Sequence, residues 1–203
     1  MTDLGRIPQT RRDGTEHLHS SGAELGFDLL GFWKWSVSDL VSNATRGRLA
    51  EYIVATAIGA ADGVRDEWAA YDLLDPRGIS IEVKSAAYIQ TWHQDRLSTI
   101  SFNCAPSFAW DPETNRQSDV KRRQAEVYVF ALLAHQHQAT LDPLDVAQWE
   151  FFVVPTVTLD RRERSQHSVT LGSLRALHGP PVGYAGLKDA IAAAAARHRR
   201  EIS

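Results

Sequence analysis

A tight turn between two strand-like runs places the strongest constraint on how this chain folds. Residues 75–78, Asp-Pro-Arg-Gly, separate residues 67–74 from residues 79–86, and both flanking runs are rich in strand-forming side chains. Pro76 at the second position and Gly78 at the fourth are typical of a type I turn that ends in the left-handed conformation. The sequence therefore predicts a β-hairpin with a three-residue loop.

The length of this loop sets the register of the hairpin. A three-residue loop pairs Asp75 with Ile79 and, counting back along both strands, Asp72 with Glu82. Directly opposite residues share one face of a sheet, with Cβ atoms about 5 Å apart. A two-residue loop would pair Asp72 with Ile81 instead and would separate the two carboxylates. The turn chemistry favours the first register, and with it an Asp–Glu pair on one surface.

Three charged side chains of this hairpin suit metal-assisted hydrolysis of a phosphodiester bond. Side chains alternate along a strand, so Glu82 and Lys84 lie on the same face. Asp72 stands alone in an apolar run, where a carboxylate needs a partner. Two carboxylates suit Mg²⁺ or Mn²⁺, and a nearby lysine can orient water or stabilise charge on the phosphate. An isolated Glu-x-Lys indicates only an exposed salt bridge, but Asp72 and the register favour a catalytic site.

Helical and strand-like patterns continue on both sides of the hairpin. A helix is predicted over residues 44–58, with Asn43 as its N-cap and Gly59 just beyond its end. Its predicted core face consists of apolar residues at helical spacing: Leu49, Tyr52, Ile53 and Ala57. A short helical turn is expected to start near Ser38. Further strands are predicted over residues 98–103, 125–133 and 149–154, and further helices over residues 171–177 and 185–200.

This order of elements predicts one α/β domain with a central mixed β-sheet flanked by helices. Residues 149–154 are apolar on both faces, so this strand is expected to be central. The segment 105–124 is a long polar loop, a feature that is often functional. Residues 1–25 are polar and aperiodic and are interpreted as a flexible arm, which leaves residues 26–203 for the domain.

The composition and motifs of the sequence exclude several classes of protein. A single cysteine, Cys104, rules out a disulfide framework and a cysteine-based zinc site. There is no apolar run long enough to span a bilayer and no secretory signal pattern, which favours the cytoplasm. The net charge of −3 argues against a protein that coats polyanions, although cations can still gather locally. The motifs of serine hydrolases and of P-loop proteins are missing from the sequence.

An upstream glutamate, Glu51, is a candidate third acidic group. On a helix, its neighbours one turn away are Gly47 and Ala55, with Ala44 one turn further back. This stripe of small residues would let the helix approach the sheet closely and direct Glu51 at the metal. An ordinary solvent-facing glutamate explains the pattern equally well.

The order of these residues resembles the PD-(D/E)XK nuclease superfamily, which has the restriction-endonuclease-like fold. The matching residues are a helix glutamate, Glu51, an aspartate on one strand, Asp72, and Glu82-Val83-Lys84 on the next. The resemblance spans about residues 43–155. It implies metal binding by Asp72 and Glu82 with help from Glu51, and a catalytic role for Lys84. Tyr71 stands where the family pattern has proline.

Candidate substrate contacts lie near this motif and in the long polar loop. They are Ser85 and Gln90, which follow the lysine, and the basic cluster Lys121, Arg122 and Arg123. Gln90 is as readily explained by local packing. A short basic cluster is also typical of a solvated surface.

The leading hypothesis is a Mg²⁺- or Mn²⁺-dependent nuclease that acts on DNA. No segment recognisably reads a base or a 2′-hydroxyl, so RNA stays an alternative substrate. The resemblance also implies a homodimer, because many nucleases of this fold cut both strands as dimers. The second hypothesis is an inactive nuclease-like module that binds nucleic acid or a protein through residues 32–35 and the basic cluster. Specificity, cleavage polarity and pathway are not encoded in any recognisable motif.

Overall fold

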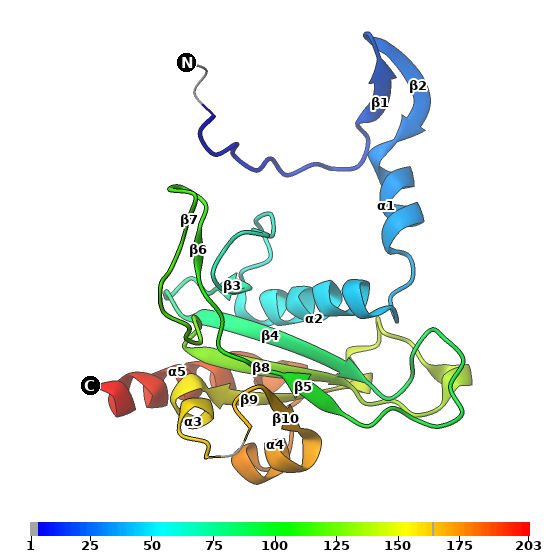
Figure 1. The fold of residues 1–203 in the computed structure, drawn as a ribbon. Helices are drawn as coiled ribbons and strands as arrows, with labels where there is room; N and C mark the ends of the chain where they lie inside the picture. The colour runs from blue at the N-terminus through cyan, green and yellow to red at the C-terminus, as the bar shows by residue number, and fades with distance from the viewer. Residues whose placement is uncertain (1–3, 164) are drawn as a thin grey trace.

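A mixed four-stranded β-sheet forms the centre of the molecule (Figure 1). The computed structural model describes residues 4–163 and 165–203. In spatial order the strands are β3 (Leu73–Leu74), β4 (Ser80–Ala87), β8 (Val127–Leu133) and β9 (Trp149–Pro155). β4 runs parallel to β8, whereas β3 and β9 are antiparallel to their neighbours. The predicted α/β fold with a mixed central sheet is confirmed.

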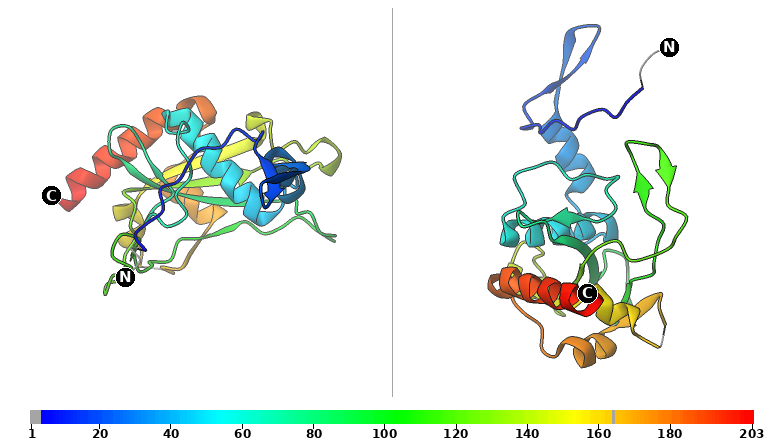
Figure 2. Two further views of the ribbon diagram at one scale, coloured as in Figure 1. Left: turned by 90° about the horizontal axis from the view of Figure 1, so that it is seen from above. Right: turned by 90° about the vertical axis from the view of Figure 1, so that its left-hand side faces the viewer.

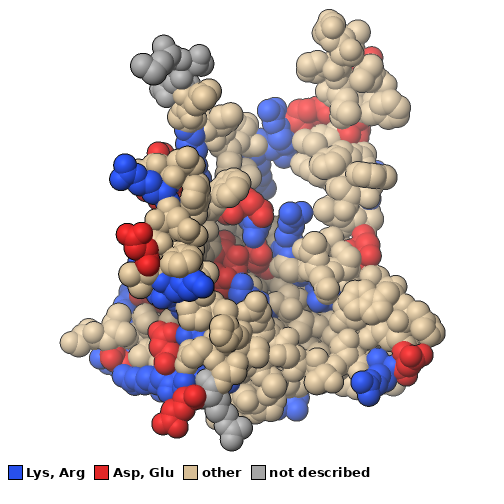
Figure 3. All heavy atoms as spheres, viewed as in Figure 1, with Lys and Arg blue, Asp and Glu red and all other residues tan. Residues whose placement is uncertain are grey.

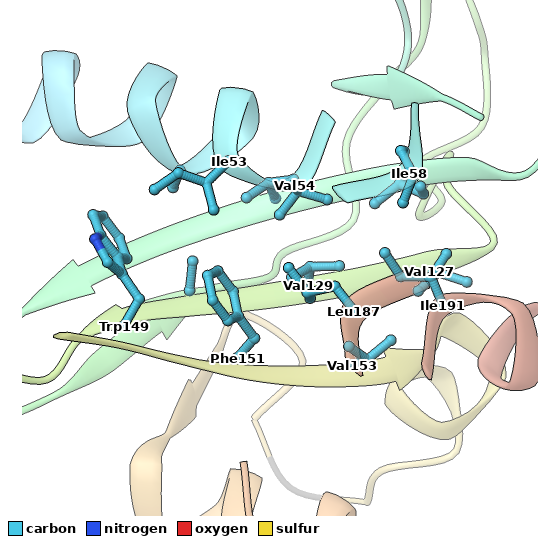
Figure 4. Packing of buried hydrophobic residues seen from close by; sticks show 14 of the residues in the cluster. Ile53, Val54, Ile58, Val127, Val129, Trp149, Phe151, Val153, Leu187 and Ile191 are labelled. Carbon is cyan, nitrogen blue, oxygen red and sulfur yellow. The ribbon is translucent and has the colours of Figure 1, made fainter. Parts of the chain in front are cut away.

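Helices cover both faces of this sheet (Figure 2). On one face, α2 (Asn43–Ile58) and α5 (Leu187–Ile202) bury an apolar cluster against alternate residues of β4, β8 and β9. Figure 4 shows this packing, with Val54 of α2 on the side of Val129 and Ile191 of α5 next to Val127. The opposite face is covered by four elements: α3 (Thr156–Asp160), α4 (Leu171–His178), β5 (Ser101–Asn103) and β10 (Ser168–Thr170). The strands β4, β8 and β9 are therefore buried on both sides over most of their length.

The helix predicted over residues 44–58 is α2, and Gly59 ends it in the left-handed conformation with φ of 75°. Ser42, rather than Asn43, is the N-cap residue, so the predicted cap is one residue off. The predicted core face is only partly right. Ile53 is buried, but Tyr52 is 58% exposed. The buried face is rotated relative to the prediction and consists of Arg46, Ala50, Ile53, Val54, Ala55 and Ile58.

Strand β9 lies at the edge of the sheet, so its prediction as a central strand is wrong. Its apolar character has a different cause. Both faces are covered by helices, and its free edge is partly closed because Phe151 and Val182 exchange two backbone hydrogen bonds of 3.0 and 2.8 Å. Burial of both faces therefore makes a strand apolar even when it has a strand on only one side.

Two other predicted strands are shorter than expected. Only Leu73–Leu74 of the run 67–74 pairs with β4, because the residues before it form turns with Trp68 61% exposed. Of the run 98–103, Ser101–Asn103 forms β5, which pairs with β10 outside the central sheet. By contrast, β8 matches the predicted strand 125–133 closely.

Two segments project to the same side of the sheet (Figures 1 and 2). The first lies within the predicted loop 105–124, where β6 (Trp110–Asp111) and β7 (Arg116–Gln117) pair as a hairpin. The second consists of the hairpin β1 (His17–Ser20) and β2 (Ala23–Asp28), followed by α1 (Leu29–Val37). The sequence did not indicate the β1–β2 hairpin. The first three residues of the predicted arm lie outside the described residues.

The helical turn predicted near Ser38 lies before that residue instead. Asp28 caps α1, because its Oδ1 accepts a 2.7 Å hydrogen bond from the Gly31 N–H. Ser38 ends the helix, and its hydroxyl donates back to the Lys34 carbonyl. A serine can satisfy either end of a helix, which is why its position alone misled the prediction.

The C-terminal helices follow the predictions. Thr170 caps α4 by accepting a hydrogen bond from the Ser173 N–H, and α5 begins two residues after the predicted start. Short 3₁₀ turns complete the fold at Gln138–Thr140, Val146–Gln148 and Tyr184–Gly186. None of the helices in the described part of the chain is both long and apolar enough to cross a membrane.

Candidate active site

The β3–β4 hairpin has the three-residue loop predicted from its sequence. The Asp75 N–H donates to the Ile79 carbonyl at 3.0 Å, and the Gly78 N–H donates to the Asp75 carbonyl at 2.9 Å. Gly78 has φ of 78°, the conformation that favours glycine at this position. Leu73 pairs with Ile81 and Leu74 with Ser80. The predicted register is confirmed for these two pairs. The ladder ends at Leu73, so Asp72 and Glu82 lie one residue beyond its last pair.

The carboxylate of Asp75 holds this turn together. Its Oδ1 accepts hydrogen bonds from the N–H groups of Arg77 and Ile79, at 2.8 and 2.9 Å, and its Oδ2 pairs with the Arg77 guanidinium at 2.6 Å. The side chain is completely buried. Burial opposes ionisation, but these hydrogen bonds and the arginine outweigh it, so the pKa of Asp75 is lowered. The register of the hairpin thus depends on a buried, ionised carboxylate.

Asp72 lies where β3 separates from β4. In an antiparallel ladder that includes the 75–79 and 73–81 pairs, the next bond would join the Val83 N–H to the Tyr71 carbonyl. The Asp72 Oδ2 accepts this hydrogen bond instead, at 2.7 Å. Burial, together with the negative charge of Glu82, raises the pKa of Asp72 to about 6. Asp72 is therefore fixed beside a second carboxylate that opposes its ionisation.

Glu82 and Lys84 lie on the same face of β4 and form an ion pair, with 2.5 Å between Lys84 Nζ and Glu82 Oε1. Burial by itself would lower the pKa of Lys84. The negative charges of Glu82, Asp72 and Glu51 outweigh burial and raise this pKa. Lys84 is therefore a cation at neutral pH, and a third of its side chain stays exposed.

Glu51 joins this group through an arginine that the sequence analysis missed. Arg65, in the loop between α2 and β3, donates to both carboxylate oxygens of Glu51, and its Nη2 lies 3.7 Å from Asp72 Oδ1. Burial raises the pKa of Glu51, and the hydrogen bond from Arg65 counteracts part of this rise. The structure therefore brings the four predicted residues Glu51, Asp72, Glu82 and Lys84 near one another, and Arg65 bridges Glu51 and Asp72.

The small-residue stripe proposed to bring Glu51 to this position is not responsible for it. A Cβ atom on Gly47 would meet no other atom within 4 Å, and Ala44 is exposed. Only Ala55 of the stripe is buried. The helix therefore does not approach the sheet closely at Gly47, and Glu51 owes its place to Arg65.

The donor set suits a divalent cation held by two carboxylates. Within residues 4–163 and 165–203, no three His, Cys, Asp or Glu side chains are grouped so that they could hold a metal ion. Mg²⁺, however, often takes only one or two protein carboxylates and keeps its waters. The negative charge of Glu82 acts on Asp72, and the Arg65 guanidinium contacts both Glu51 and Asp72, which indicates that these carboxylates attract a cation. Asp72 and Glu82 are the two carboxylates that could hold such a cation.

A second arginine that was not predicted as a site residue, Arg46 of α2, lines a cavity together with Lys84. It is 3% exposed and donates to the side chains of Ser85, at 3.2 Å, and Gln90, at 3.3 Å. Its other acceptors are the Asn43 side chain and the Val41 carbonyl, both at 2.7 Å. All four acceptors are neutral, and burial lowers the pKa of Arg46. A buried positive charge without a carboxylate partner is costly, and an anionic ligand would offset that cost.

Arg46, Lys84, Ser85 and Gln90 line one cavity of about 440 Å³. Two candidate substrate contacts predicted from the sequence, Ser85 and Gln90, are therefore neighbours beside Lys84. The sequence does carry a signal for Arg46, because it occupies the same helical stripe as Ala50, Ile53 and Val54. An arginine in a core-facing stripe is unusual and needs an explanation.

The three residues of the predicted basic cluster, Lys121, Arg122 and Arg123, have different environments in the structure. Lys121 and Arg122 are exposed, with Lys121 Nζ 5.0 Å from the centre of the Phe108 ring. Arg123 is buried and pairs with Asp160 at 2.5 Å, and it also donates to the Cys104 and Gln166 carbonyls. Its guanidinium holds the loop to the core, which removes the geometric basis for its predicted contact with substrate.

The acidic cluster lies in a hollow between the two projecting segments, with basic side chains around it (Figure 3). A cavity of about 470 Å³ beside it is lined by Arg11, Arg48, Glu51, Arg65 and Asp72, among others. The N-terminal segment crosses over this region in Figure 1. Arg6 ties it to Asp66 at 2.5 Å and to Glu113, near the tip of the β6–β7 hairpin, at 2.8 Å. The site is thus recessed and has a rim of arginines.

The fold is a mixed β-sheet flanked by helices, and its β3–β4 hairpin carries Asp72, Glu82 and Lys84 close together. These features are consistent with a nuclease-like α/β protein. Residues 33–172, well over half of the chain, match the model of a family described as bacteriophage T4 endonuclease IV. The chain belongs to this family, and it is therefore a nuclease by family. The matched region contains all four candidate catalytic residues. No curated protein and no solved structure matches the chain.

Proposed function

We propose that this protein is a DNA endonuclease that depends on Mg²⁺ or Mn²⁺ and belongs to the PD-(D/E)XK type. The observation that supports the proposal is the hairpin register, which pairs Leu73 with Ile81. It brings Asp72 within the electrostatic influence of Glu82, and Lys84 lies on the same face of β4 as Glu82. The endonuclease family match supports the reaction class, and the order Glu51, Asp72, Glu82, Lys84 supports the superfamily.

Each residue has a distinct role in this proposal. Asp72 and Glu82 would hold the metal, which polarises the phosphate and lowers the pKa of a bound water. The Val83 N–H fixes the Asp72 carboxylate in place before any metal arrives. Because Lys84 is a cation at neutral pH, it donates rather than accepts a proton. It is suited to orienting the attacking water or to stabilising negative charge on the phosphate as the P–O bond breaks.

The Lys84→Ala variant tests this proposal. We expect it to cut at least about a hundredfold more slowly than the wild type, because it removes the positive charge that stabilises the transition state. Supercoiled plasmid, linear duplex DNA, single-stranded DNA and RNA would each be incubated with Mg²⁺ or Mn²⁺. Lys188→Ala, at an exposed position of α5, is the matched control and should cut like the wild type. Equal cutting by Lys84→Ala would show that the mechanism is wrong.

Arg46 is proposed to counter the charge of a substrate phosphate in the cavity beside Lys84. Arg46→Gln should raise KM about tenfold and weaken the salt dependence of binding by about one counterion, with kcat much less affected. Arg46→Lys should recover part of the affinity, and Arg200→Gln, at the C-terminal end of α5, should change nothing. If Arg46 had a purely structural role, Arg46→Gln would instead lower the free energy of unfolding and leave the salt dependence of binding unchanged.

A nuclease-like module that binds nucleic acid without cutting it is the second candidate. One observation favours it. In the described residues Arg65 and Lys84 already neutralise the carboxylates, and no three-ligand metal group is present. Tight binding of one of the four nucleic acids, combined with no cutting under any metal condition, would support this second function.

A further inference from the structure

The segment 17–37, here called the aromatic arm, exposes an unusual amount of apolar surface. It comprises the β1–β2 hairpin and α1 and projects from the body of the molecule (Figures 1 and 2). None of the residues of α1 is buried. Six large apolar side chains of the arm are between 43% and 84% exposed: Leu18, Leu25, Phe27, Leu30, Phe32 and Trp35.

The arm has few contacts that could hold it in this position. Two backbone hydrogen bonds of 2.9 Å join the start of α1 to the preceding segment, at Gly14 and Glu16. Gly14 has φ of 98°, and a Cβ there would lie 2.9 Å from the Trp33 ring, so glycine is needed where Trp33 packs. A two-stranded hairpin alone is marginally stable in water. The exposed face of the arm is therefore left uncovered by residues 4–163 and 165–203 of this chain.

Four of the six exposed side chains lie around one concavity. Leu18, Phe27, Phe32 and Trp35 surround a concavity of about 350 Å³. Taking about 150–200 Å² for each whole large apolar residue, the six residues together expose roughly 500–700 Å². This is at or above the largest apolar patch of a typical monomer, roughly 300–600 Å². It is close to the roughly 800 Å² that each partner contributes to a stable interface.

The charge of the arm argues against nucleic acid and against an anionic membrane surface as its partner. Between residues 17 and 37, Lys34 is the only lysine or arginine, and it is opposed by Glu24 and Asp28. Binding to phosphates requires several cations, and binding to anionic lipids does as well. An apolar surface with almost no net charge is typical of the buried core of a protein–protein interface.

We propose that the aromatic arm is a homodimer interface, in which the arms of two copies cover each other. The arm carries both a projecting side chain, Trp35, which is 84% exposed, and a concavity bounded by apolar side chains. A two-fold interface needs one surface that is complementary to itself. A projecting side chain next to a concavity provides this, because the side chain of each copy can enter the concavity of the other. The β1–β2 hairpin precedes the region matched to the endonuclease family, whereas Trp35 lies within that region.

Sedimentation equilibrium of the full chain tests this proposal without reference to nuclease activity. The wild type at about 10 μM should have twice the monomer mass of 22.6 kDa. Trp35→Ser should raise the dimer dissociation constant at least about tenfold, because exposed tryptophans are frequent hot spots. The double variant Phe32→Ser with Trp35→Ser should be monomeric. Because α1 buries no residue, the far-ultraviolet circular dichroism of both variants should match the wild type.

Trp92→Ser is the matched control, since Trp92 is 57% exposed but lies outside the arm. It should sediment as the wild type does. A wild type that stays monomeric at about 100 μM would overturn the proposal, and so would a dimer that persists in the double variant. A monomer that binds neutral lipid vesicles through Trp35 would assign the arm to a membrane surface instead and would also overturn it.

Discussion

Asp72→Asn is expected to make the metal-free protein more stable at neutral pH while abolishing its cleavage of DNA. In the folded chain, burial and the charge of Glu82 raise the pKa of Asp72 from 3.8 to about 6. An ionised Asp72 therefore costs free energy in the fold, and asparagine removes that cost. The amide oxygen of asparagine can still accept the hydrogen bond from the Val83 N–H. Asparagine cannot replace a carboxylate as a ligand of Mg²⁺ with the same affinity.

The pH dependence follows from the direction of this pKa shift. A group whose pKa is higher in the folded state binds more protons there, so its contribution to stability is complete below about pH 4. The contribution is lost as the pH rises through about 6. A rise of about two pKa units corresponds to at most about 3 kcal/mol. In EDTA, wild type and Asp72→Asn should therefore differ little near pH 4 and differ by about 1–3 kcal/mol at pH 7.5.

Urea unfolding at several pH values, with and without Mn²⁺, measures both parts of this prediction. Mn²⁺ should stabilise the wild type, because a ligand that binds only the folded state raises its stability, and it should have little effect on Asp72→Asn. Asp95→Asn is the control, since that side chain is 97% exposed. If Asp72→Asn is less stable than the wild type at pH 7.5 or still cuts DNA, Asp72 is a structural residue.

The parts of the site that were predictable from the sequence are those fixed by local chemistry. Pro76 and Gly78 select one turn, the turn selects one register, and the register brings Asp72 to Glu82. Alternation along β4 then places Lys84 on the same face as Glu82. None of these steps needs knowledge of a distant residue, because all five positions lie within residues 72–84.

The parts that were not predictable depend on contacts between distant segments. Arg65 meets Glu51 from 14 positions away, and Arg46 meets Gln90 from 44 positions away. Arg123 looked like a surface cation in its basic cluster, but the fold buries it against Asp160. A sequence gives the charge of an arginine but not its burial, so its role could not be assigned before the fold was known. The edge position of β9 was unpredictable for the same reason. Helices from distant parts of the chain bury its faces, so its sequence is as apolar as that of a central strand.

Asp75→Ala should remove both the stability of the hairpin and the activity of the site. The substitution leaves the Arg77 and Ile79 N–H groups without their acceptor in a buried turn and breaks the pair with the Arg77 guanidinium. Loss of such a buried carboxylate should lower the free energy of unfolding by about 2–4 kcal/mol. With the turn weakened, the three-residue loop competes with shorter loops, and a two-residue loop would pair Asp72 with Ile81. Cleavage should then fall even in the fraction of protein that remains folded.

Asp75→Asn separates the two contributions. Its amide oxygen can still accept from the two N–H groups, so it should keep the register and most of the activity while losing about 1 kcal/mol with the ion pair. Cleavage rates would be compared at a temperature at which each variant is folded by circular dichroism. Full activity in folded Asp75→Ala would mean that Pro76 and Gly78 alone determine the register. Equal loss of activity in both variants would mean that the charge of Asp75, rather than its hold on the turn, supports the site.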